Sequence, residues 1–215
     1  DYVERSKQPW AGDPGQSVNY ASCHDNYTLW DKLKLSCPKA SNEEMRKMMK
    51  LSGALVLTSQ GIPFLHAGVD FCRTKGGHAN SYKSPDSINQ IDWNRKEAFE
   101  DVFRYYQKLI EMRKKHPAFR MWKTEQVQNH IKFCTEYKVG VVSYCINGRE
   151  MNDPWQDIVL IFNGSRKPAV VPLPEGNFKI AVKGDEFYAD GQGDTISGEI
   201  ETDPVSMTIL VTTEN

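Results

Sequence analysis

The sequence lacks the features that mark membrane proteins, nucleic-acid-binding proteins and disulfide-stabilised domains. No apolar run approaches the roughly 20 residues that a membrane span needs. The 27 Lys and Arg residues are balanced by 28 Asp and Glu residues, and the formal net charge of −1 argues against a nucleic acid or an anionic membrane as partner. With 215 residues, the chain can bury a hydrophobic core without disulfides or a structural metal.

Several common catalytic signatures are also missing. There is no GxxxxGK[ST] phosphate loop and no GxGxxG motif after a predicted strand, so nucleotide binding has no support. HExxH is absent and the five histidines are scattered, so a metal site is unsupported. The serine-hydrolase motif GxSxG is absent as well. The sequence therefore predicts no cofactor, and nothing in it supports a calcium site.

The cysteines indicate free thiols and not a disulfide framework. Their number is odd and none belongs to a CxxC pair. They are Cys23, Cys37, Cys72, Cys134 and Cys145. Free thiols are typical of a reducing compartment, which favours a cytoplasmic location, and we expect any signal peptide to lie upstream of Asp1. A nucleophilic Cys23 beside His24 is an alternative, but adjacent residues of a strand point to opposite faces.

The first half of the chain has the pattern of a βα protein. Apolar runs at residues 18–21 and 62–67 do not alternate, which predicts strands buried on both faces of a parallel sheet. Between them, Ser41-Asn42-Glu43-Glu44 forms a capping-box pattern that predicts the start of a helix. Apolar residues at helical spacing predict a second helix over 95–116, whose basic last turn we interpret as a solvated face.

After residue 123 the pattern consists of short strands separated by turn residues. The predicted strands cover residues 127–134, 139–146, 158–162, 169–173, 178–182, 195–199 and 205–211. Dipeptides such as Asn147-Gly148 and Asp190-Gly191 separate them. This spacing is typical of an antiparallel β-sandwich, so the sequence predicts α/β structure in residues 1–122 followed by an all-β domain in residues 123–215.

Two polar clusters follow the two predicted strands. His24 and Asp25 come directly after the first, where ligands meet the carboxyl ends of parallel strands. Taken alone, this dipeptide is a weak motif, and Asp25 as a helix cap beside a structural His24 is the simpler interpretation. The long connection at residues 68–89 follows the second strand and combines a guanidinium, carboxylates, carboxamides and aromatic rings, which suit a polyhydroxylated ligand.

These segments resemble a known enzyme family. VNYASCHDN at residues 18–26, continued by YTLWDKL, resembles the region-four motif of α-amylase-superfamily glycoside hydrolases, and in detail the type I pullulanases, which are α-1,6 debranching enzymes. GIPFLHAG at residues 61–68, with RTKGG, NSYKSPDSIN and QIDW, is similar to the eighth strand of their barrel and its following loop. The resemblance implies the last two βα units of a TIM (β/α)8 barrel plus a C-terminal antiparallel β-sandwich.

The resemblance also implies roles for individual residues. Asp25 would be the third catalytic carboxylate, which binds sugar hydroxyls and stabilises the oxocarbenium-like state, and His24 would bind the same sugar. Positions that match the donor-subsite loop are Arg73, Asn80, Tyr82, Asp86 and Asn89. The chain departs from the family at two positions. Relatives often carry an acidic residue at the position of Val69 and a Glu at that of Asp70, and we interpret both departures as tuning of the activity and not as its loss.

The resemblance further predicts that this chain is the C-terminal piece of a pullulanase. Retaining glycosidases need a nucleophile and a general acid about 5–5.5 Å apart, and in this family both precede the HD motif. Nothing before Val18 supplies them, so we expect the isolated chain to be inactive. The expected partners are an α-glucan and the missing N-terminal part of the enzyme. Because two βα units cannot close a barrel, we also expect exposed sheet edges and weaker order before residue 123.

A non-catalytic module is the alternative from a different functional class. In this interpretation the sandwich binds carbohydrate, or is purely structural, and carries exposed aromatic rings on one face. The candidate rings are Trp155, Phe178, Phe187 and Tyr188.

Overall fold

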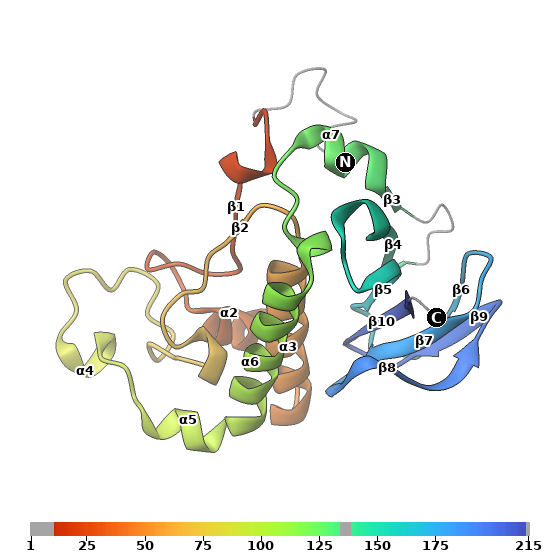
Figure 1. The fold of residues 1–215 in the computed structure, drawn as a ribbon. Coiled ribbons are helices and arrows are strands. Elements are labelled where there is room, and N and C mark those ends of the chain that lie inside the picture. Colours follow the sequence, from red (N-terminus) through yellow and green to blue (C-terminus); the bar gives the residue numbers. More distant parts are fainter. Residues whose placement is uncertain (1–10, 134–138, 214–215) are drawn as a thin grey trace.

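The computed structural model describes residues 11–133 and 139–213 (Figure 1). A helical part is followed by an antiparallel sheet part, and we use these two names for residues 11–122 and 123–213. Asp1, Cys134 and the end of the strand predicted over residues 127–134 lie outside the described residues.

The helical part contains two very short strands and five α-helices among its described residues. Its elements are η1 (Pro14–Gln16), β1 (Val18–Asn19), α2 (Leu29–Ser36), α3 (Asn42–Thr58), β2 (Ile62–Pro63), η2 (Val69–Phe71), α4 (Asp86–Asn89), α5 (Asn94–Ala98), α6 (Glu100–Lys115) and η3 (Pro117–Phe119). Helices α3 and α6 lie side by side and form the centre of this part (Figure 1).

Helix α3 begins where the sequence predicts. The Ser41 hydroxyl accepts a hydrogen bond from the Glu44 amide at 3.1 Å, and the Glu44 carboxylate accepts one from the Ser41 amide at 2.9 Å. This capping box satisfies two amides that have no partner within the helix. Met45, Met49 and Leu57 are buried, which confirms that the methionine-rich face packs into the core.

The second predicted helix is interrupted, and two of its basic residues have other roles. Phe99, with φ −123° and ψ 36°, separates α5 from α6, and its ring packs against Trp30 with 5.0 Å between centroids. Arg113 and His116 are buried, so the solvated-face interpretation is wrong for these two residues. The Arg113 guanidinium donates to the carbonyl groups of Leu57, Ser59 and Gly61 at 2.8–2.9 Å, which ties α6 to the end of α3.

Strands β1 and β2 pair in parallel, as the βα pattern predicts, but they are short and exposed. Val18 pairs with Ile62 and Asn19 with Pro63. Val18 and Ile62 are exposed, so the prediction of strands buried on both faces is wrong for this chain. Tyr20 and Phe64 continue the exposed apolar surface, with ring centroids 6.0 Å apart.

The sheet part contains a six-stranded and a two-stranded antiparallel sheet. The six strands lie in the order β3-β4-β5-β10-β7-β8, and β6 pairs with β9. Their bounds are β3 (Ile131–Phe133), β4 (Val141–Asn147), β5 (Trp155–Asn163), β6 (Ala169–Pro172), β7 (Phe178–Lys183), β8 (Glu186–Ile196), β9 (Glu199–Thr202) and β10 (Ser206–Thr213). The 3-10 turn η4 (Arg149–Met151) precedes β5.

Two predictions about the sheet part are wrong. Residues 124–130 form helix α7 (Thr124–His130) instead of a strand. Gln126 accepts from the Lys123 amide, and the Asp13 carboxylate, far away in the sequence, accepts from the Thr124 amide, so both stabilise the start of this short helix. Strand β8 runs through the predicted turn at Asp190-Gly191, since Gly191 adopts φ +70° at an irregular pairing with β7. The strand predicted over 195–199 is therefore the end of β8 and the start of β9.

The two faces of the larger sheet are covered by different layers. One face packs against α3 and α6 in a single core cluster; its strand residues include Ile158, Leu160, Met207 and Ile209. The opposite face packs against β6 and β9; its strand residues include Val159, Ile161 and Leu210. The helical part and the sheet part therefore share one hydrophobic core, and the smaller sheet closes the other side.

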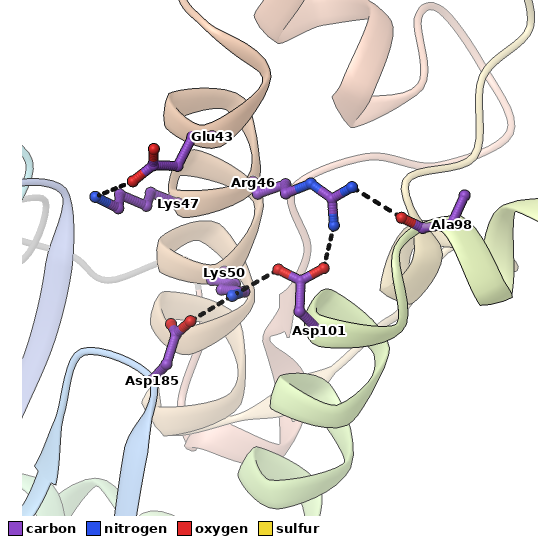
Figure 2. A network of polar contacts seen from close by, with 7 residues as sticks. All are labelled: Glu43, Arg46, Lys47, Lys50, Ala98, Asp101 and Asp185. Carbon is purple, nitrogen blue, oxygen red and sulfur yellow. Dashed lines mark hydrogen bonds and ion pairs between the residues drawn. The ribbon is translucent and has the colours of Figure 1, made fainter.

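A network of ion pairs lies over the junction of α3, α6 and the β7–β8 turn (Figure 2). The Lys50 ammonium group lies 2.8 Å from Asp101 of α6 and 2.5 Å from Asp185 of the turn. Arg46 also pairs with Asp101 and donates to the Ala98 carbonyl group at 2.8 Å. Lys50 is almost completely buried, so this network joins the two parts of the chain at their interface.

Candidate active site

The two predicted polar clusters lie at one edge of the β1–β2 pair. Residues 22–26 follow β1 and residues 68–89 follow β2, and the two strands are parallel. Both segments therefore leave the sheet at the carboxyl ends of neighbouring strands, where ligands bind in βα folds. Lys75 of the second segment donates to the carbonyl group of His24 at 3.2 Å, which shows that the segments are in contact.

His24 and Asp25 present their side chains to solvent. The exposed fractions are 84% and 73%, and the His24 Nε2 atom lies 3.5 Å from an Asp25 carboxylate oxygen. Asn26 adopts φ +61°, which turns the backbone toward α2 directly after the pair. Thr28 then caps α2 by accepting from the Asp31 amide at 3.2 Å, so Asp25 does not serve as that cap.

Arg73 and Asn89 hold the second segment in shape. The Arg73 guanidinium donates to the carbonyl groups of Ala67 at 3.1 Å and Asn89 at 2.5 Å. The Asn89 carboxamide donates to the carbonyl groups of Ser81 and Ser84 at 2.7 and 2.9 Å. These bonds tie the beginning, the middle and the end of the connection to one another. Asn80, Tyr82 and Asp86, in contrast, are exposed on its outside, and Tyr82 is 75% exposed.

Three buried residues of the site were missed by sequence reasoning. Asp31 accepts hydrogen bonds from Thr28, from Thr74 and from the Lys75 amide. His66 and Lys75 are buried beneath the exposed residues. The spacing of Thr28 and Asp31 is an N-cap pattern and could have indicated α2, but no sequence pattern predicts that Asp31 reaches Thr74 and Lys75.

Burial shifts the pKa values of His66 and Asp70 in this site. Burial, with added repulsion from Arg73, Lys75 and His24, lowers the pKa of His66 to about 4, so its ring is neutral at pH 7. Burial also raises the pKa of Asp70. Two buried polar atoms of the site, Ser22 Oγ and Arg73 Nε, have no hydrogen-bond partner among the described residues. Buried polar groups are normally paired, so these two atoms are exceptions in the part of the chain that the structure describes.

The contacts of Cys23 and the burial of Cys72 give no support to a nucleophilic thiol. The Cys23 Sγ atom lies 3.9 Å from the carbonyl oxygen of Asp25. Burial raises the pKa of Cys72 to about 12, so this thiol is protonated at neutral pH. Among the described residues, no group of three or more His, Cys, Asp or Glu side chains is placed to hold a metal ion. None of the described helices has the length and apolar character of a membrane span.

The aromatic residues named for a carbohydrate-binding module are largely in the core. Trp155 and Phe178 are 3% exposed, and Trp155 stacks on His116. Phe187 is partly buried and contacts Tyr105 with ring centroids 5.4 Å apart. Tyr188 is also partly covered and donates to Glu186. These four residues therefore form no exposed aromatic platform on the sheet part.

Comparison with known proteins gives a consistent result. Residues 127–186 match the family described as "Pullulanase, all-beta domain". The pullulanase of Bacillus subtilis (strain 168) is 41% identical over 166 residues, which cover 77% of this chain and 23% of that protein. The solved pullulanase from Bacillus acidopullulyticus superposes with a TM-score of 0.89 at 36% identity, over 94% of this chain and 25% of that one. The chain belongs to the pullulanase family.

The match is to the C-terminal portion of pullulanases, as the motifs predict. The chain spans about a quarter of the length of the first relatives it matches. A pullulanase from Anoxybacillus sp. LM18-11, solved in complex with maltotetraose, is 41% identical, with a TM-score of 0.84 over 94% of this chain and 28% of that chain. A Paenibacillus barengoltzii pullulanase was solved with maltohexaose and α-cyclodextrin, and is 40% identical.

Proposed function

We propose that this chain is the portion of a retaining glycoside hydrolase that supplies the third carboxylate and the donor-subsite loop for cleavage of α-1,6 branch linkages. The substrates would be pullulan-, glycogen- or starch-type α-glucans. The observation that supports this most directly is the contact between residues 22–26 and residues 68–89 at one edge of a parallel strand pair. The malto-oligosaccharide complexes of related pullulanases agree with an α-glucan ligand.

In this proposal the exposed and the tethered residues have different roles. Asp25 and His24 are exposed beside each other and can both bind hydroxyl groups of one sugar. Tyr82 can stack on a sugar ring, and Asn80 and Asp86 can bind hydroxyls, because all three are on the outside of the connection. We assign Arg73 and Asn89 to shaping the loop, since their polar groups are engaged by backbone carbonyl groups.

We further propose that residues 1–122 are the end of a (β/α)8 barrel and residues 123–215 a C-terminal β-sandwich. The parallel pair β1–β2, with α3 following one strand and α6 the other, has the order of two βα units. Val18, Tyr20, Ile62 and Phe64 leave an apolar surface open beside this pair. The remaining part of the enzyme would cover that surface, and would also supply the nucleophile and the general acid.

The test is to join this chain to the upstream part of the Bacillus subtilis relative as one polypeptide. We expect the joined protein to release reducing ends from pullulan and the isolated chain to release none above a buffer blank. In the joined protein, Asp25→Ala is expected to lower kcat about a hundredfold or more, because a group that stabilises the transition state is lost. Glu175→Ala, an exposed carboxylate in the β6–β7 turn, is the control and should leave the rate unchanged.

Two results would contradict the proposal. Activity of the isolated chain would show that it carries its own nucleophile and acid. Equal activity of the joined protein with and without Asp25→Ala would remove Asp25 from the catalytic machinery.

A further inference from the structure

We propose that Lys75 is a positioning residue of this site, whose ammonium group fixes the backbone at His24 and thereby sets the direction of the His24 and Asp25 side chains. This inference rests on the proposed function for its consequence in sugar binding. The fixation itself can be tested without any sugar.

The ammonium group of Lys75 connects the two segments of the site. It donates to the Ser81 hydroxyl at 2.7 Å and to the His24 carbonyl oxygen at 3.2 Å. Ser81 belongs to the connection after β2, and His24 follows β1. The Asn89 carboxamide in turn donates to the Ser81 carbonyl group, so the acceptor of the Lys75 ammonium group is held from its other side.

The backbone of Lys75 is held by a separate buried contact. The Asp31 carboxylate accepts from the Lys75 amide at 2.8 Å and from the Thr74 hydroxyl. Asp31 is 3% exposed and lies in the first turn of α2, the helix that begins just after the His24–Asp25 pair. The ammonium group and the backbone amide of Lys75 are therefore anchored separately, the first at His24 and the second at Asp31, which follows the pair.

The surroundings of Lys75 explain why a lysine is suited to this position. The residue is 6% exposed, so its ammonium group has left bulk water and depends on protein acceptors. Burial and repulsion from Arg73 lower the pKa of Lys75, while Asp25 and Asp31 oppose this shift. The neutral ring of His66 adds no competing positive charge at pH 7. A charged donor so placed makes stronger hydrogen bonds than a neutral one.

The exposed side chains of the pair need such support from the backbone. His24 and Asp25 are in large part surrounded by solvent, so few neighbouring side chains restrict them. Asn26 at φ +61° fixes the chain on one side of the pair. The contact from Lys75 to the His24 carbonyl group restrains the backbone at the pair itself. A geometry fixed before the sugar arrives lowers the entropic cost of binding.

The experiment is backbone ¹⁵N relaxation by NMR on the 215-residue chain, which gives order parameters for residues 22–27, α3 and β10. Lys75→Met keeps the apolar stem and removes the donors, so we expect the order parameters of residues 22–27 to fall below about 0.6 while those of α3 and β10 stay at about 0.85. Lys75→Arg retains charged donors and should restore most of the order. Lys83→Met is the matched control, because this lysine of the same connection lies over the Tyr82 ring.

Three outcomes would overturn the inference. Unchanged order parameters over residues 22–27 in Lys75→Met would show that the ammonium group does not restrain the pair. An equal fall of the order parameters in α3 and β10 would indicate a general loss of stability. An equal loss of order at residues 22–27 in Lys75→Met and Lys75→Arg would show that side-chain shape decides, and not the charged donors. Failure of the joined enzyme to cleave pullulan would contradict the proposed function and leave these three readouts intact.

Discussion

The His116 imidazole and the Asp153 carboxylate form a buried pair, with 2.7 Å between Nδ1 and Oδ1, at the contact between the helical part and the sheet part. His116 follows the last turn of α6, and Asp153 precedes β5. The imidazole also stacks on Trp155 with 3.6 Å between ring centroids. The second carboxylate oxygen accepts from the Ala118 amide at 2.9 Å, so the Asp153 side chain of the sheet part binds two residues at the end of the helical part.

Asp153→Ala is expected to destabilise the chain strongly. The substitution leaves His116 and the amides of Ala118 and Trp155 buried without their acceptor. Breaking a buried pair in this way costs about 3–5 kcal/mol. Urea unfolding followed by circular dichroism measures the change. Asp203→Ala, at an exposed carboxylate, is the control and should shift the free energy of unfolding by less than about 0.5 kcal/mol. Similar losses in both variants would contradict the prediction.

The pair of Asp101 with Lys50 predicts an acid-sensitive contribution to stability (Figure 2). Burial alone would raise the pKa of Asp101, but the hydrogen bonds and charges of Lys50 and Arg46 outweigh it and hold the pKa below 3.8. A carboxyl group with a lowered pKa in the folded state stabilises fully above its unfolded pKa, and this contribution is lost as the pH falls through the folded value.

The measurement is the free energy of unfolding between pH 7 and pH 2. Stability should begin to fall near pH 4, and in Asp101→Asn this acid limb should be shallower. The pKa of Lys50 is raised despite its burial, because Asp101 and Asp185 stabilise the ammonium form, so the Lys50 contribution is lost only as the pH rises above about 10.5. Glu175→Gln, at an exposed carboxylate, serves as the control. An acid limb in Asp101→Asn as steep as in the parent chain would refute the assignment.

Gly53→Ala is expected to destabilise the chain although alanine favours helices. Gly53 lies inside α3 against the ring of Tyr106, and a Cβ atom there would come within 2.4 Å of the ring. The gain in helix propensity is about 1 kcal/mol, whereas overpacking of a core costs about 1–3 kcal/mol. Thermal unfolding should therefore show a lower Tm for Gly53→Ala. Ser52→Ala, at the preceding position of the same helix, is the control, and a rise of Tm in both variants would contradict the steric argument.

Local patterns in the sequence predicted the elements that local contacts stabilise. The Ser41–Glu44 capping box placed the start of α3 correctly, because both of its hydrogen bonds lie within one turn. The strand-like segments and turn residues placed β5, β7 and β10 within a few residues, because these strands are long or end at clear turns. Helix α7 was predicted as a strand; Gln126 caps it locally, but its contact with Asp13 comes from more than a hundred residues away.

In the candidate site, too, the sequence predicted the local motifs and not the contacts between distant residues. His24, Asp25 and the polar connection were recognised from contiguous motifs, and their placement at one edge of β1 and β2 follows from the parallel pairing. The pattern did not indicate that Arg73 donates to backbone carbonyl groups, or that Lys75 and Asp31 link the two segments. These contacts join residues 16 to 51 positions apart, and no periodicity or short motif contains that information.

The family, the order of helices before strands and the two polar segments could be predicted from the sequence, because each depends on residues that are neighbours in the chain. The folded chain was needed to show that one sheet face is shared with α3 and α6, that Lys50 and His116 join the two parts, and that Val18 and Ile62 are exposed. These features depend on burial and on the approach of distant side chains, which arise only when the chain packs.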